Sequence, residues 1–124
     1  MDKWWLILGA VNGFLAVALG AFGAHGLHDR LAASDRLATW ETAVSYQVYH
    51  GLALLAVGLL AARGVGFAGP ASGWCFLLGI VLFSGSLYAL CLTQIKMLGA
   101  ITPIGGMLFL AGWVLLAVAG AKVT

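Results

Sequence analysis

The amino-acid sequence predicts an all-α fold: a transmembrane four-helix bundle with an amphipathic interfacial segment between its first and second helices. Two observations predict this fold. Of the 124 residues, 63% are hydrophobic and only 8% are charged, whereas soluble domains carry about 25% charged residues. The hydrophobic residues also fall into four runs, each close to the roughly 20 residues that a helix needs to cross about 30 Å of hydrocarbon.

The four apolar runs are expected to be the membrane-spanning helices. They cover about residues 4–24, 43–62, 71–93 and 101–121. Within hydrocarbon every backbone N–H and C=O must be paired without water, and a helix achieves this inside one segment. Strands are not expected, because the runs are too long for strands and do not alternate between apolar and polar residues. No linker-like stretch interrupts the chain, so residues 1–124 are predicted to form a single integral membrane domain.

Residues at the ends of the runs support these boundaries. Gly69 and Pro70 precede the third run, and Thr102 followed by Pro103 is typical of an N-cap and the first helical position of the fourth. Tryptophans are common at membrane edges, where the ring is buried and the N–H reaches water. Four tryptophans are predicted to lie at such edges: Trp4, Trp5, Trp40 and Trp74.

The connection between the first two runs, residues 25–42, has room for structure of its own. It holds five of the ten formally charged side chains, namely Asp29, Arg30, Asp35, Arg36 and Glu41. Ser34 is a plausible N-cap, and Leu37, Trp40 and Val44 recur at helical spacing. We therefore expect an amphipathic helix over about residues 28–42 that lies on the membrane surface and runs into the second span. The alternative is a short disordered loop.

Small residues are unusually frequent, with 18 glycines in the chain. A glycine inside a helix costs about 1 kcal/mol relative to alanine, so close packing of helices is the expected compensation. In the first run, small residues repeat at spacings of four and three and predict a groove along one face: Gly9, Gly13, Ala16, Gly20 and Gly23. The pairs Gly51 with Gly58 and Gly105 with Gly112 lie seven apart, which keeps each pair on one face of its helix.

Polar side chains inside apolar spans are the candidate functional residues, because they are costly there. Tyr46, Gln47 and His50 share one face of the second run, and Glu41 lies near its membrane edge. In one interpretation His50 binds a polar ligand or relays a proton in a partly hydrated pocket. In the other, the three residues form hydrogen bonds between helices that fix the packing. The candidate partners for such bonds are Asn12, Ser84, Ser86, Tyr88 and Thr102.

His25, His28 and Asp29 form a second candidate site, since their spacing places three potential metal ligands on one side of a helix end. No fourth thiolate or histidine is close in sequence, and interfacial histidines commonly cap carbonyls. No metal and no cofactor are predicted. The sequence also lacks a nucleophile elbow, a P-loop and a zinc-protease motif, and its four acidic residues leave little room for paired-carboxylate catalysis. An enzyme is the least favoured class.

Three stretches of this sequence are similar to a known family. They are residues 20–27 (GAFGAHGL), 40–50 (WETAVSYQVYH) and 99–106 (GAITPIGG). The chain resembles the membrane family called domain of unknown function 423, whose animal members are named transmembrane protein 256. The resemblance implies a small four-span protein of bacterial inner membranes or, in eukaryotes, of mitochondria. It brings no established activity.

Three functions fit the sequence. The favoured one is a non-catalytic scaffold or accessory component of a membrane assembly, either a homo-oligomer or part of a larger complex, embedded in the lipid bilayer of a bacterial inner membrane. The alternatives are a small transporter or channel that uses the polar residues around His50, and a subunit that binds lipid or quinone. Nucleic acid is not an expected partner, because the net charge of +2 is scattered and forms no basic face.

Overall fold

The computed structural model describes residues 2–123, and the regular elements in that part of the chain are all helices. In chain order they are α1 (Asp2–Ala24), α2 (His28–Ala33), α3 (Leu37–Ala61), α4 (Ala68–Thr93), the 3₁₀ helix η1 (Lys96–Ala100) and α5 (Thr102–Ala121). The four long helices match the predicted spans in number and type, so the predicted fold class is confirmed.

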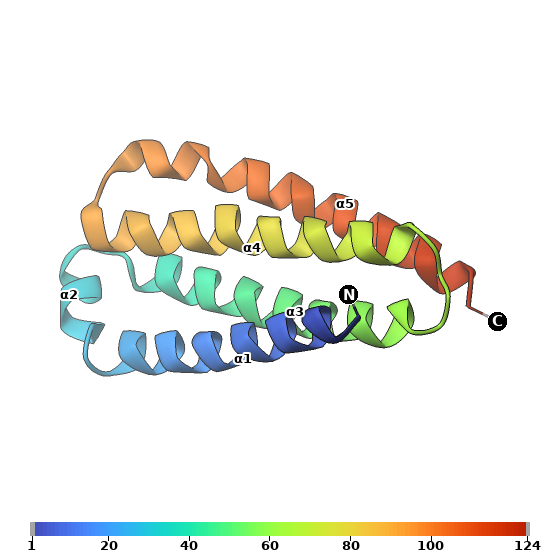
Figure 1. Cartoon of the computed structure of the whole chain (residues 1–124). Helices are drawn as coiled ribbons and strands as arrows, with labels where there is room; N and C mark the ends of the chain where they lie inside the picture. Colours follow the sequence, from blue (N-terminus) through green and yellow to red (C-terminus); the bar gives the residue numbers. More distant parts are fainter. Residues whose placement is uncertain (1, 124) are drawn as a thin grey trace.

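Consecutive long helices run antiparallel, and each packs against the next (Figure 1). α1 packs on α3, α3 on α4, and α4 on α5, whereas α1 and α5 share no extensive contact. The short α2 closes one end of the molecule, and both chain ends lie toward the opposite end. α3 and α4 therefore form the centre of the bundle, and α1 and α5 form its sides.

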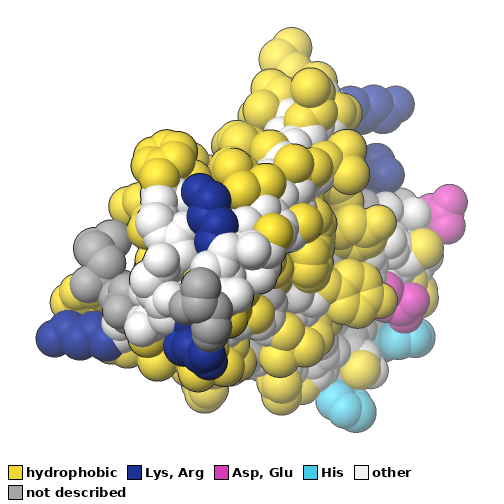
Figure 2. Space-filling model, turned by 90° about the vertical axis from the view of Figure 1, so that its right-hand side faces the viewer, with side chains coloured by type: hydrophobic (Ala, Val, Ile, Leu, Met, Phe, Trp, Pro, Cys, Tyr) yellow, Lys and Arg dark blue, Asp and Glu magenta, His cyan; other side chains and the backbone are white. Residues whose placement is uncertain are grey.

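Each long helix is long and apolar enough to cross a membrane. The four candidate spans are Lys3–Ala24, Leu37–Ala61, Ala68–Thr93 and Lys96–Ala121. The shortest has 22 residues, and at about 1.5 Å per residue it exceeds the roughly 30 Å of hydrocarbon. Within an apolar 18-residue stretch of each span, only 22% of the residues are buried inside the protein in the first and fourth spans, against 44% and 39% in the central two. Hydrophobic side chains dominate the surface in Figure 2, while the visible acidic and histidine side chains gather at one edge.

The predicted surface helix over residues 28–42 is instead two helices with a break between them. Ser34 is not an N-cap: its Oγ donates to the carbonyl of Arg30 at 3.1 Å, at the end of α2. Asp35 has a φ of 58°, a left-handed conformation that an α-helix does not continue through. α3 then begins at Leu37, so Trp40 and Glu41 belong to the spanning helix itself.

The α2 segment is held against the end of α4. Leu31 is fully buried, Arg30 Nη2 donates to the carbonyl of Leu92 at 2.7 Å, and Arg36 Nε donates to Gln94 Oε1 at 3.1 Å. Leu92 lies in the last turn of α4, where carbonyls have no partner inside the helix, so a guanidinium there supplies a missing donor. The segment thus packs an apolar side chain inward, caps α4 with Arg30 and bonds the Gln94 side chain with Arg36.

Two other helix starts differ from their prediction by a few residues. α4 begins at Ala68, which places Gly69 and Pro70 inside its first turn. Proline is tolerated there because first-turn N–H groups have no partner within the helix. Thr102 is the first residue of α5 and not its N-cap, which is Ile101. The Thr102 hydroxyl lies 2.6 Å from Ser86 Oγ, so it joins two helices.

Two of the four tryptophans differ from the prediction. Trp4 and Trp74 are about half exposed. The N–H of Trp5 and that of Trp40 do not reach water as expected: Trp40 Nε1 donates to the carbonyl of Leu19 at 2.8 Å, and Trp5 Nε1 is buried with no hydrogen-bond partner. Trp5 lies instead in the main apolar core, beside Val57 and Phe76.

Glycines allow the long helices to approach closely, as their spacing predicts. A Cβ placed on Gly9 would lie 2.9 Å from the carbonyl oxygen of Gly51, across the α1–α3 contact. A Cβ on Gly105 would collide with the backbone nitrogen of Phe83, across the α4–α5 contact. Gly13 is an exception in the predicted groove, because a Cβ there would meet nothing within 4 Å.

This difference between glycines gives a test of the packing. Gly105→Ala is expected to destabilise the protein by about 1–3 kcal/mol, because the new methyl group forces the α4 and α5 backbones apart. Gly13→Ala is the matched control, and it should leave stability unchanged or raise it by about 1 kcal/mol through the better helix propensity of alanine. The free energy of unfolding in detergent micelles measures both. Equal effects of the two substitutions would contradict the packing described here.

Candidate functional site

Gln47 is the centre of a hydrogen-bond chain that joins three helices. Its Nε2 donates to Asn12 Oδ1 on α1 at 3.0 Å, and its Oε1 accepts from the hydroxyl of Tyr88 on α4 at 2.7 Å. Asn12 Nδ2 in turn donates to the carbonyl of Leu8 at 2.9 Å. Gln47 is only 4% exposed and Asn12 only 7%. Every polar end of the two amides is therefore engaged inside the protein, and we refer to Asn12, Gln47 and Tyr88 as the amide chain.

His50 lies on the same helix but in a different group. Its Nδ1 lies 2.7 Å from the carbonyl oxygen of Tyr46, and Trp113 Nε1 on α5 donates to its Nε2 at 3.0 Å. The ring stacks on Phe109 with centroids 3.5 Å apart and planes 4° from parallel. An indole nitrogen only donates and a carbonyl only accepts. The geometry therefore requires the neutral imidazole with its hydrogen on Nδ1, and both ring nitrogens are occupied.

Two serines of α4 form further bonds between helices. Ser84 Oγ donates to the carbonyl of Ala43 on α3 at 2.7 Å, and Ser86 Oγ lies 2.6 Å from the hydroxyl of Thr102 on α5. Ser84 is fully buried. A buried polar group without a partner costs several kcal/mol in hydrocarbon, and each of these hydroxyls has one.

The face that the sequence predicted as one cluster is thus divided between two sides of α3. Gln47 points to α1 and α4, whereas His50 points to α5. Tyr46 contributes its carbonyl to His50 and stacks its ring on Phe83 at 4.5 Å, with 38% of the side chain exposed. Sequence reasoning missed Trp113. The signal was available, because this is the one tryptophan away from the predicted membrane edges, and an indole N–H in the middle of a span, away from water, needs an acceptor in the protein.

The remaining candidate residues lie at the end of the molecule that α2 closes, and they do not form a metal site. His28 Nδ1 lies 3.4 Å from Asp29 Oδ1. In the described part of the chain no three His, Cys, Asp or Glu side chains come close enough to hold a metal ion, so the candidate set His25, His28 and Asp29 is not brought together. Glu41 is exposed, and within residues 2–123 its carboxylate has no ion pair.

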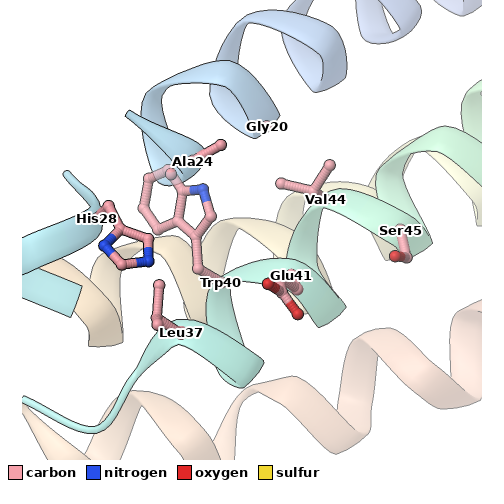
Figure 3. A pocket seen from close by; sticks show the side chains of 9 residues that line it. Gly20, Ala24, His28, Leu37, Trp40, Glu41, Val44 and Ser45 are labelled. Carbon is pink, nitrogen blue, oxygen red and sulfur yellow. The ribbon is translucent and has the colours of Figure 1, made fainter. Parts of the chain in front are cut away.

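A cavity of about 300 Å³ lies at this end, between α1 and α3 (Figure 3). We call it the Glu41 cavity. It is lined by Gly20, Gly23 and Ala24 of α1, His28 of α2, and Leu37, Trp40, Glu41, Val44 and Ser45 of α3. It brings together two of the predicted candidates, Glu41 and His28, which belong to different helices but line the same space.

Comparisons with known proteins agree with this architecture. A profile described as "Protein of unknown function (DUF423)" matches residues 19–106. A "UPF0382 membrane protein" of Staphylococcus epidermidis is 53% identical over 124 residues, covering 97% of each chain. The "UPF0382 membrane protein YwdK" of Bacillus subtilis is 51% identical over 122 residues, covering 97% of this chain and 98% of its own. No solved structure matches.

The relatives are named as bacterial membrane proteins, and the structure has four helices that are long and apolar enough to span a bilayer. With the matching profile and the length of the similarity, these findings establish that the chain is a multi-pass integral membrane protein that belongs to the DUF423 family, whose function is unknown.

Proposed function

We propose that this protein is a non-catalytic component of a membrane assembly, in which the small bundle associates with further copies of itself or with a larger membrane complex. The observation that carries this proposal is the pairing of polar side chains across helix contacts. Asn12, Gln47 and His50, the buried polar groups that a solute pathway would use, bond to other protein groups.

A transport pathway requires polar groups that are free to bind water or solute. The amide chain offers none, since each amide is held at both ends. A proton relay at His50 would require Nε2 to take up a proton, and Trp113 already directs its own N–H at that nitrogen. These bonds support a structural role for the polar residues, as interhelical contacts that fix the packing.

The outer surfaces of the bundle support association with other membrane components. Phe14 and Val17 on α1 are each 74% exposed, and Met107 on α5 is 70% exposed. An apolar groove of about 330 Å³ also runs along the amide chain, past Leu15 and Gly85. Inside a bilayer such surfaces meet either lipid or another helix, and small residues favour close approach of a helix.

The assembly is tested by photo-crosslinking inside the membrane. A photoreactive benzoylphenylalanine at position 14 or 107 reaches outward from α1 or α5, and we expect at least one of the two positions to yield a discrete protein adduct on a denaturing gel. The same group in place of Phe76, an aromatic residue that is fully buried, serves as the control for adducts within the chain. Lipid adducts alone at both outer positions would contradict the proposal.

Transport is tested directly in proteoliposomes. Vesicles that contain the wild-type protein should pass protons no faster than empty vesicles, because both nitrogens of His50 are occupied. His50→Ala should leave this rate unchanged, as should Tyr49→Ala, which removes an exposed ring from the same helix. A pH-sensitive dye inside the vesicles measures the rate. Wild-type flux that His50→Ala abolishes and Tyr49→Ala retains would establish the transporter in place of the scaffold.

The structural role of the amide chain predicts a difference between two tyrosines. Tyr88→Phe removes the hydroxyl that donates to Gln47 and should lower the free energy of unfolding by about 0.6–2 kcal/mol. Tyr49→Phe removes an exposed hydroxyl and should leave stability within about 0.5 kcal/mol of wild type. Reversible unfolding in mixed detergent measures both values. If Tyr88→Phe is as stable as Tyr49→Phe, the amide chain does not hold the helices together.

A further inference from the structure

The Glu41 cavity has a fixed wall on one side. Trp40 is only 3% exposed, and its N–H is bonded to the carbonyl of Leu19 on α1. The indole lies against Gly23, where a Cβ would collide with it, and it meets Tyr88 edge-on with centroids 4.8 Å apart. Because these contacts fix the ring, the cavity exists before any ligand arrives, as is usual for binding sites.

The cavity carries a negative charge with no partner. Of the cations at this end, Arg30 donates to the carbonyl of Leu92 and Arg36 donates to Gln94. Neither of these two, nor Lys96 of η1 at the same end, forms an ion pair with Glu41, and in the part of the chain that the structure describes the only ion contact is between His28 and Asp29. Figure 3 shows His28 and Glu41 on the two sides of Trp40, with Val44 and Ser45 farther along α3. The carboxylate is therefore available to a cationic group of a ligand.

Polarity falls along the face of α3 that continues from the cavity. Glu41, Ser45, Tyr49 and Leu52 follow one another at spacings of four, four and three, which keeps them on one side of the helix. The series passes from a carboxylate to a hydroxyl, an aromatic ring and an aliphatic chain, and Tyr49 and Leu52 are 55% and 60% exposed. Eleven residues of helix cover about 16 Å. A matching ligand has a cationic head and an apolar tail that extends into the membrane.

We propose that the Glu41 cavity binds the headgroup of phosphatidylethanolamine, with its ammonium at the Glu41 carboxylate and an acyl chain along Tyr49 and Leu52. A primary ammonium donates up to three hydrogen bonds to carboxylate and hydroxyl oxygens, here Glu41 and Ser45, and hydrogen bonds between charged groups are the strong ones. An anionic headgroup such as that of phosphatidylglycerol would instead be repelled by Glu41.

Lipid titration of the delipidated full chain in detergent tests this assignment, with bound lipid counted by native mass spectrometry. Phosphatidylethanolamine is expected to bind about tenfold more tightly than phosphatidylglycerol, a difference of about 1.4 kcal/mol. Glu41→Gln keeps the shape and removes the charge, and it should abolish this preference. Asp35→Asn is the matched control: it removes a charge at the same end outside the cavity, at a left-handed position that asparagine accepts, and it should retain the preference.

Two further measurements distinguish a lipid site in the cavity from lipid bound elsewhere on the bundle and from a site for the free headgroup. Ala24→Phe fills the cavity from the rim of α1, where residue 24 is exposed, and should weaken phosphatidylethanolamine binding at least about fivefold by steric exclusion. Free phosphoethanolamine should not compete at equal concentration, because it lacks the apolar tail. The proposal is overturned if the two lipids bind equally to the wild type, if Glu41→Gln keeps the preference, if Ala24→Phe binds normally, or if the free headgroup competes as well as the lipid.

Discussion

Hydrocarbon offers no hydrogen-bond partner to an amide, an imidazole or a hydroxyl, and the arrangement of this bundle depends on that constraint. Gln47 and His50 of α3 and Ser84 of α4 lie where a neighbouring helix supplies a donor or an acceptor. Gln47 fixes α3 against α1 and α4, and His50 fixes it against α5. α1 packs on α3 and α5 packs mainly on α4, so the central pair α3 and α4 positions both sides of the molecule.

Polar chemistry is divided between two environments in this protein. In the middle of the spans the polar side chains are not available to a ligand, because Asn12, Gln47 and His50 form hydrogen bonds with one another or with other groups of the helices. At the end covered by α2 a polar side chain is available: Glu41 has a cavity before it and no counterion among the described residues. A scaffold role for the interior and a lipid site at the edge are therefore compatible, since they use different side chains.

The sequence was sufficient for the number and type of the helices, because apolar runs of this length have one workable conformation in a membrane. The small residues also predict that helices approach one another closely, as α1 and α3 do at Gly9 and Gly51, but they do not specify which helices pair. The sequence did not determine which helix end a residue adjoins or which neighbouring helix a side chain faces. A serine hydroxyl accepts from an N–H at the start of a helix or donates to a carbonyl at its end, so the sequence does not specify which helix end Ser34 adjoins. Whether Gln47 and His50 share a partner depends on how neighbouring helices are rotated, which periodicity along one helix does not specify.

The order of packing in the bundle also bears on how the protein is built. α1 packs on α3 and α4 on α5, so each extensive contact joins consecutive spans, and the turn between the two pairs contains Gly64 and Gly66 in left-handed conformations. Contacts close in sequence form fast, and chains fold from the N-terminus during synthesis. The hairpin of α1 and α3 can therefore reach its native packing while α4 and α5 are still being synthesised. The α3–α4 contact then joins two hairpins that have already folded.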